Sequence, residues 1–280
     1  MKKNKTALLA LSLAAALFAG CSAGGAPQAA SSGDGAPAAV TLKVGASPTP
    51  HAEILTEAAK ELASQGITLD IVEFTDYVQP NLALDSGELD ANFFQHGPYL
   101  DQFNADRGTK LVSVGTVHYE PLGLYAGKSA SVKDLPDGAS IAVPNDTTNE
   151  ARALLLLQSE GLLTLKEGAG VNATQTDIAE NPKGLKIQEI APEQAARSLQ
   201  DVDLAVINGN YAILGGLNIA DALAQEAADS LAAETYANVL AVREGDEARP
   251  EIAALLKALQ GDAVKTFIEN SYAGAVVPKS

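Results

Sequence analysis

Short strand-like runs alternate with amphipathic stretches from Leu42 almost to the last residues of the chain. The runs are rich in β-branched residues, and glycine, proline, asparagine or aspartate lies between them. This alternation predicts an α/β fold in which helices cover sheets of largely parallel strands. We expect strands at 42–46, 67–73, 89–94, 110–118, 122–126, 140–144, 185–190, 203–207 and 238–243.

Helical periodicity is clearest between the first two predicted strands. Ile54, Ala58 and Leu62 recur at intervals that place them on one face of a helix, and Gly66 closes the segment. Strand, helix and strand together predict one βαβ unit. Two more helical patterns follow near the end of the chain, at 250–259 and 262–270.

A third helix is predicted from Thr147. Thr147 and Glu150 have the T-x-x-E spacing of a capping box, so we expect the helix to begin at Thr147. Counted from that cap, Asn149 and Arg152 lie on one face near the positive end of the helix. This end of the helix would attract an anion.

The first residues have the layout of an export signal. Three lysines precede an apolar run at 7–19, which is too short to span a bilayer, and Gly20-Cys21 follows. We predict a signal peptide at 1–20 and an acylated Cys21 that tethers the protein to a membrane surface. Phe18 stands where the lipobox usually has leucine. An ordinary buried thiol is the alternative for Cys21, the only cysteine of the chain.

The acylated cysteine would begin a linker at 21–39, because this segment consists almost entirely of Ala, Gly, Ser and Pro. The remaining 240 or so residues suffice for one large or two modest lobes. The formal net charge is −16, and such a surface repels nucleic acid and anionic lipid head groups. We therefore expect no nucleic-acid partner.

The stretch 90–99 gathers two phenylalanines, a histidine and a tyrosine in a chain with no tryptophan. Aromatic rings beside polar side chains suit an apolar pocket with a few orienting groups. Core packing is the alternative. Asn92, Gln95 and His96 favour a pocket, because burying them without partners is costly and a ligand could supply those partners.

This stretch, together with 145–154 and 207–212, resembles the methionine-binding lipoprotein family of bacterial ABC importers, and the resemblance runs from about Leu42 to the last residue. It implies a two-lobed, type II periplasmic-binding-protein-like fold with the ligand cleft between the lobes. Lobe one would comprise 40–120 plus 240–280, and lobe two 121–239. Thr147 and Ala151 stand where this family commonly has proline and glycine.

The family's function implies a lipoprotein on the extracytoplasmic face of the membrane that captures methionine and delivers it to an importer. L-methionine is the first candidate ligand. D-methionine and related compounds are further candidate ligands. The chain contains no G-x-x-x-x-G-K-[ST] phosphate loop, so a separate ATPase and a permease would be its partners. No cofactor is expected.

Three polar residues are candidates for holding the backbone groups of an amino acid. Arg152 would bind the carboxylate, because a guanidinium offers paired donors and stays charged when desolvated. Asn208 follows a buried strand and Asn238 begins one, and both amides can accept from an ammonium or donate to a carboxylate. An exposed helix arginine and ordinary turn asparagines are the alternatives. The resemblance favours Asn208 and Asn238 over Asn149 and Asn210, and Asn149, on the same helix face as Arg152, is kept as a further ligand-binding candidate.

Aromatic residues are assigned to the pocket for the ligand's side chain, because a thioether gains from contact with aromatic rings. The candidates are Tyr77, Phe94, His96 and Tyr99, and core packing is the alternative for the two tyrosines. Tyr119 and Tyr125 are additional candidates for the wall.

Two other functions remain open at this point. His51, His96 and His118 with an acid could form a zinc or manganese site of a metal-transport lipoprotein, although no two of them have the spacing of a paired metal motif. A two-lobed cleft could also serve an enzyme. The one G-x-S-x-G match, at 20–24, lies in the predicted signal and linker with no predicted strand before it, and the sequence has no G-x-G-x-x-G fingerprint, so we expect no catalytic activity.

Overall fold

The computed structural model describes residues 39–227 and 231–279. The predicted signal peptide at 1–20, Cys21 and nearly all of the predicted linker lie outside the described residues. Within the described part of the chain, no helix is both long enough and apolar enough to cross a bilayer.

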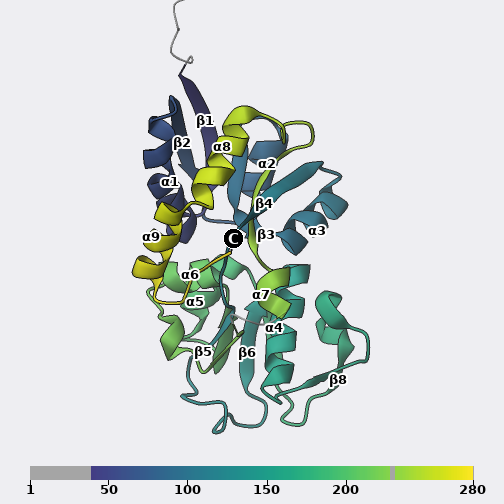
Figure 1. Cartoon of the computed structure of the whole chain (residues 1–280). Helices are drawn as coiled ribbons and strands as arrows, with labels where there is room; N and C mark the ends of the chain where they lie inside the picture. Colours follow the sequence, from purple (N-terminus) through teal and green to yellow (C-terminus); the bar gives the residue numbers. More distant parts are fainter. Residues whose placement is uncertain (1–38, 228–230, 280) are drawn as a thin grey trace, which may run out of the picture. The chain divides into compact units, whose positions relative to one another are not determined.

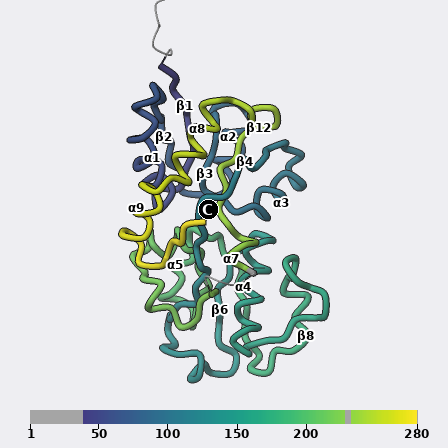
Figure 2. The backbone as a smooth tube through the Cα atoms, in the orientation of Figure 1, coloured from purple at the N-terminus to yellow at the C-terminus, as the bar shows by residue number. Residues whose placement is uncertain are grey.

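The first of two main sheets has six strands in the order β13-β4-β12-β3-β1-β2. β1 pairs in parallel with β2 and β3, whereas β12 runs antiparallel to β3 and β4. Figure 2 shows β12 beside β3 and β4, although these two strands are far from it in the sequence. The strands are β1 (Val40–Ala46), β2 (Ile67–Glu73), β3 (Ala91–His96), β4 (Leu111–Tyr119), β12 (Asn238–Arg243) and β13 (Val277–Pro278).

The second sheet has five strands in the order β11-β5-β10-β6-β9, and a separate two-stranded ribbon pairs β7 with β8. β6 is parallel to β9 and β10, and β5 is antiparallel to β10 and β11. The strands are β5 (Gly123–Ala126), β6 (Ser140–Pro144), β7 (Thr164–Leu165), β8 (Ile178–Glu180), β9 (Lys186–Ile190), β10 (Leu204–Ile207) and β11 (Ala224–Gln225).

Helices cover both faces of each sheet (Figure 1). The longer ones are α1 (Glu53–Ala63), α2 (Gln79–Asp85), α3 (Gly97–Arg107), α4 (Thr147–Ser159), α8 (Pro250–Leu259) and α9 (Asp262–Tyr272). Shorter ones are α5 (Ala195–Ser198), α6 (Gly209–Leu214) and α7 (Leu231–Thr235). Single helical turns are η1 (Pro48–Ala52), η2 (Gly170–Asn172), η3 (Gln175–Asp177), η4 (Pro192–Gln194) and η5 (Ile219–Asp221).

The alternation of side chains along β12 separates two cores of the first sheet. Leu240 and Val242 pack in a cluster with α1, α8 and α9, whereas Val239 and Ala241 pack in a cluster with α2 and α3. This is the two-residue period of a strand that is buried on both faces. In the second sheet, α4 covers one face and α5 with α6 covers the other.

The predicted βαβ unit is present. Ile54, Ala58 and Leu62 are buried on the face of α1 that meets the sheet, and burial of each leucine or isoleucine stabilises the fold by about 1.5–3 kcal/mol. Gly66 follows the helix with a φ of 75°, a conformation that glycine adopts without a steric penalty. The turn into β2 therefore depends on this glycine.

All nine predicted strands occur, but the prediction of largely parallel strands is wrong. Only pairings of β1 with β2 and β3, and of β6 with β9 and β10, are parallel, and the other pairings are antiparallel. The chain passes from β4 directly to β5 in the other sheet and returns at β12. These crossings insert strands of opposite direction, which the local sequence pattern does not reveal.

The predicted capping box at Thr147 is also wrong, although α4 does begin at this residue. Asp146 is the N-cap, and its Oδ1 accepts a hydrogen bond from the backbone N–H of Asn149 at 3.0 Å. Glu150 does not fold back onto the cap. Its carboxylate accepts instead from the backbone N–H of Gln175 at 3.1 Å. The cap therefore lies one residue earlier than the T-x-x-E pattern indicates.

Candidate functional site

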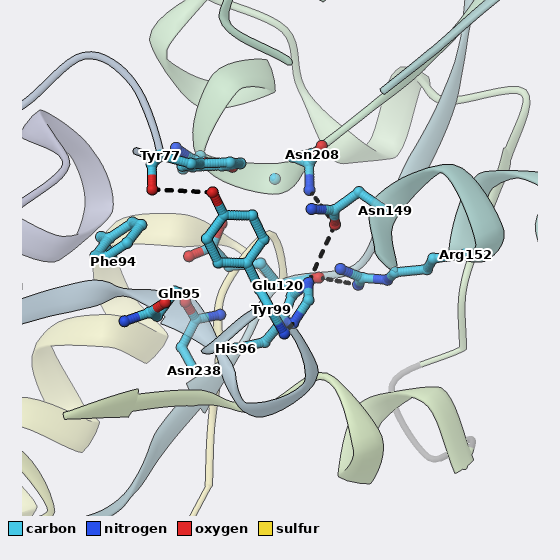
Figure 3. Close-up of a pocket in the computed structure, with 12 residues that line it drawn as sticks. Tyr77, Phe94, Gln95, His96, Tyr99, Glu120, Asn149, Arg152, Asn208 and Asn238 are labelled. Carbon is cyan, nitrogen blue, oxygen red and sulfur yellow. Dashed lines mark hydrogen bonds between the residues drawn. The ribbon is translucent and has the colours of Figure 1, made fainter. Parts of the chain in front are cut away.

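A pocket lies where the two sheets approach each other, and all eight residues predicted to bind a ligand line it (Figure 3). About 340 Å³ of space lies between its atoms, part of it open to solvent. The lining residues are Tyr77, Phe94, Gln95, His96, Tyr99, Glu120, Asn149, Arg152, Asn208, Gly209, Asn210 and Asn238. Many of them follow the last residue of a strand or begin a helix, where ligands of α/β sheets are usually met.

Aromatic rings form one wall of the pocket. The ring of Tyr77 lies 5.9 Å from that of Phe94 and 5.7 Å from that of Tyr99, measured between centroids. The hydroxyl of Tyr99 donates to the backbone carbonyl of Tyr77 at 3.0 Å, which fixes the two rings against each other. The neighbouring ring of Phe93 points into the core instead, because adjacent strand residues face opposite sides.

His96 connects this wall to the polar side of the pocket. Its Nδ1 accepts from the backbone N–H of Tyr99 at the start of α3, so Nε2 carries the proton and donates to Oδ1 of Asn149 at 3.1 Å. Burial and the nearby guanidinium of Arg152 lower the pKa of His96 to about 3. His96 is therefore neutral at physiological pH.

Asn149 in turn orients Asn208. Its Oδ1 also accepts from Nδ2 of Asn208 at 2.8 Å, while its own Nδ2 donates to Asp146 at 2.8 Å. The remaining Oδ1 of Asn208 is buried and has no hydrogen-bond partner within residues 39–227 and 231–279. A buried acceptor without a donor is costly, so this atom indicates a ligand that donates a hydrogen bond.

Arg152 is buried, which excludes the exposed helix arginine. Its Nε donates to Oε1 of Glu226 at 2.7 Å, and its Nη2 donates to Oε2 of Glu226 at 2.5 Å and to the carbonyl of Glu120 at 2.8 Å. The guanidinium carbon lies 4.6 Å from the ring centre of Tyr236. Within the described residues, Nη1 makes no hydrogen bond and remains able to donate.

Asn238 lies opposite His96 and His118 at the start of β12. Its Oδ1 is 3.0 Å from Nε2 of His51. Since that oxygen is occupied by the imidazole, the Nδ2 group of Asn238 is left as the donor at the pocket. This amide therefore complements an acceptor such as a carboxylate.

Two polar residues of the 90–99 stretch do not need a ligand, contrary to our expectation. Asn92 donates to Oδ1 of Asn81 at 2.8 Å, and Gln95 donates to the same oxygen at 2.7 Å. Asn81 lies on α2, and nothing in its local sequence indicates this role. The hydrogen-bonding argument for a ligand therefore rests on Asn208 and not on Asn92 or Gln95.

The two additional wall candidates are wrong. Tyr119 does not line the pocket. Its hydroxyl donates at 2.6 Å to Oε2 of Glu226, the oxygen that also accepts from Arg152. Tyr125 packs in the core between β10 and α6. Glu120 and Glu226 were missed. A charged residue directly after the apolar end of a predicted strand is a signal that could have found Glu120, whereas nothing in the local sequence marks Glu226.

The predicted three-histidine set is not brought together. His51 and His118 lie close to Glu120, and this is the group of potential metal ligands that the described residues form. His96 is not part of it and bonds to Asn149 instead. The metal-binding alternative therefore lacks the three-histidine site on which it was based.

Residues 42–280 match the NlpA lipoprotein family. The chain is 43% identical over 244 residues to "Methionine-binding lipoprotein MetQ" of Bacillus subtilis, which covers 85% of this chain and 88% of that protein. A crystal structure of a putative lipoprotein from Ruminococcus gnavus is 54% identical, with a TM-score of 0.85, and covers 86% of this chain and 99% of that one.

A nutrient-binding protein from Burkholderia cenocepacia, solved bound to methionine, is 49% identical with a TM-score of 0.81 and covers 85% of this chain and all of that one. These structures confirm the predicted two-lobed periplasmic-binding fold. The family is one of substrate-binding proteins and is not a class of enzymes. From the matched length, the shared fold and these identities, the chain is a member of the NlpA lipoprotein family.

Proposed function

We propose that this protein captures methionine in the pocket lined by Phe94, Arg152 and Asn208 and delivers it to an ABC importer. The observation that carries the proposal is the buried Oδ1 of Asn208, an acceptor without a partner among the described residues. It lines the same pocket as the aromatic wall and the guanidinium. The name of the Bacillus subtilis relative and the methionine in the Burkholderia cenocepacia structure support methionine as the ligand.

Each part of methionine has a matching group in the pocket. The free Nη1 of Arg152 and the Nδ2 of Asn238 donate to the carboxylate. The Oδ1 of Asn208 accepts from the ammonium, and Asn149 and His96 hold that amide in place. The rings of Tyr77, Phe94 and Tyr99 surround the thioether, and each such contact contributes about 0.3–1.5 kcal/mol.

The arrangement of the pocket residues supports closure of two lobes around the ligand. Lobe one would comprise 40–120 plus 240–280, and lobe two 121–239. Phe94 and His96 then belong to the first lobe, and Asn149, Arg152 and Asn208 to the second. A ligand that touches both lobes stabilises the closed state through contacts made only on closure.

Delivery requires partners that the chain itself does not supply. A permease and an ATPase would receive the methionine, and acylated Cys21 would hold the protein at the extracytoplasmic face of the membrane. We expect no catalysis, because the pocket groups complement a bound zwitterion and the described residues that line the pocket include no nucleophile paired with a base.

A thermal-shift panel of the twenty amino acids tests the proposal. The protein is unfolded and refolded first, so that any ligand carried through purification is removed. Methionine at 100 times its dissociation constant should stabilise the fold by about 2.7 kcal/mol. L-methionine and D-methionine are compared in the same panel. No shift with either methionine, or an equal shift with unrelated amino acids, would contradict the proposed function.

A further inference from the structure

Three buried ionisable side chains have no role in the assignment above. His51 lies in η1, His118 lies near the end of β4, and Glu120 follows β4 at the first crossing between the sheets. All three are at least nine-tenths buried. Glu120 also lines the pocket, as Asn208 and Asn238 do (Figure 3).

One oxygen of Glu120 accepts a hydrogen bond from His118 and lies close to a second imidazole, that of His51, whose Nε2 is hydrogen-bonded to Oδ1 of Asn238. Nε2 of His118 lies 2.7 Å from Oε1 of Glu120, and Nε2 of His51 lies 3.3 Å from the same atom. Since a carboxylate oxygen can only accept, each Nε2 carries the proton. Burial lowers the pKa of His51 to about 4 and that of His118 to about 3, so both rings are neutral donors.

The other oxygen of Glu120 lies at the pocket wall. A Cβ added to Gly209 would come within 2.9 Å of Oε2 and within 2.7 Å of the Cβ of Glu120. Gly209 lines the pocket as well. The Glu120 carboxylate can therefore lie against the backbone of residue 209 only because this residue is a glycine.

The charges around the pocket do not balance at Glu120. The cation of the pocket, Arg152, is matched by Glu226 in a two-point ion pair. The neutral imidazole of His118 and the backbone N–H of Asn210 donate to Glu120, and burial raises the pKa of its carboxyl group. A buried carboxylate is costly unless a cation pairs with it, and here that cation would have to enter with the ligand.

We propose that the Glu120 carboxylate is the counter-ion for the α-ammonium group of the ligand, with the Oδ1 of Asn208 as the second acceptor. This inference rests on the proposed function and adds the group that selects for an amine. The site is then specific for primary α-amino acids. An analogue with the same tail and carboxylate but without the amine would leave Glu120 and Asn208 unpaired.

Calorimetric titration of refolded protein with L-methionine and with 4-(methylthio)butanoic acid, which lacks only the amine, tests this role. The wild type should prefer methionine by at least about 100-fold. Glu120→Gln keeps the size of the side chain and removes its charge. Glu120→Gln should weaken methionine binding about 10- to 100-fold, which is the loss expected when a hydrogen bond to a charged group is removed. The same variant should change the affinity for the analogue less than about threefold.

Two further variants make the outcome specific. Glu88→Gln changes an exposed glutamate in the same way, and both ligands should bind to it as to the wild type. Gly209→Ala displaces the Glu120 carboxylate without removing its charge and should reproduce the selective loss of methionine. This variant carries the test if Glu120→Gln does not fold.

Three results would overturn the inference. Equal loss of both ligands in Glu120→Gln would mean that the residue only supports the pocket structurally. Unchanged methionine affinity in Glu120→Gln and Gly209→Ala would exclude any role in binding. A wild type that binds both ligands equally well would also exclude it, while leaving the proposed function intact. By contrast, a wild type that binds no methionine would overturn both proposals.

Discussion

Arg152 and Glu226 form a buried two-point ion pair, with Nε donating to Oε1 at 2.7 Å and Nη2 donating to Oε2 at 2.5 Å. Glu226 lies at the end of β11, 74 residues further along the chain. The pair and the carbonyl of Glu120 occupy Nε and Nη2, and among the described residues Nη1 makes no hydrogen bond. The Arg152 charge is therefore already paired, and ligand selectivity must depend on directed hydrogen bonds as well as on charge.

Breaking this pair should separate stability from ligand binding. Glu226→Gln leaves the buried guanidinium without its counter-charge and should lower the free energy of unfolding by about 3 kcal/mol. Methionine affinity should not fall, because Nη1 is unaffected and the guanidinium loses a competing carboxylate. Urea unfolding and calorimetric titration measure the two effects. Glu160→Gln, at an exposed position, is the control and should change neither. A large loss of affinity in Glu226→Gln would show that Glu226 itself is needed for binding.

Removing the orphan acceptor should weaken binding far more than it weakens the fold. Asn208→Ala eliminates the Oδ1 atom that lacks a partner and one hydrogen bond to Asn149. We expect a 10- to 100-fold loss of methionine affinity, of the order of about 1.5–3 kcal/mol for a hydrogen bond to a charged group. Unfolding of the ligand-free protein should change by no more than about 1 kcal/mol. Asn172→Ala at an exposed position provides the comparison, and an affinity equal to that of this control would remove Asn208 from the site.

Acid should destabilise the protein in part through His96. Its pKa is lowered from 6.5 to about 3 in the folded protein, so between these values the unfolded chain binds one more proton than the native state. Stability is therefore lost as the pH falls below 6.5. Between pH 6.5 and 5.5, His96 alone should account for about 1 kcal/mol.

The matched comparison for this pH effect is His96→Gln, which cannot titrate. Arg152 and Glu226 face His96, and both stay charged in this range, because the pKa of Arg152 is raised and that of Glu226 is lowered by their pairing. Urea unfolding at the two pH values should show a smaller loss of stability in the variant than in the wild type. Equal losses would mean that His96 does not titrate in the expected way.

The correct cap of α4 can be identified by two alanine substitutions. Asp146→Ala removes the acceptor for the backbone N–H of Asn149 and should lower stability by about 1–2 kcal/mol. Thr147→Ala should be nearly neutral, because Thr147 is exposed and caps nothing. Thermal or urea unfolding of both variants measures the difference. The opposite ranking would restore the capping box that the sequence pattern indicates.

The strands and the location of the pocket were predictable because their signals are local. The runs of β-branched residues mark each long strand, and Phe94, Arg152 and Asn208 each lie beside a strand end or a helix start. The three positions belong to different sheets or to a helix that covers one, and they come together at the pocket. Their roles in ligand binding remain predictions.

The features that escaped prediction depend on contacts distant in the sequence. Glu226 reaches Arg152 from the end of β11, and Asn81 on α2 satisfies Asn92 and Gln95. The antiparallel pairings of β3 and β4 depend on where β12 enters their sheet. At the start of α4, Asp146 and Thr147 are both good capping residues, so the local pattern could not decide between them.

A crystal structure of the refolded protein with L-methionine tests the central claim most directly. We predict one methionine in the pocket, with its carboxylate at Nη1 of Arg152, its ammonium at Oδ1 of Asn208 and its thioether against the ring of Phe94. Methionine bound elsewhere on the protein, or absent from this pocket at saturating concentration, would contradict the account.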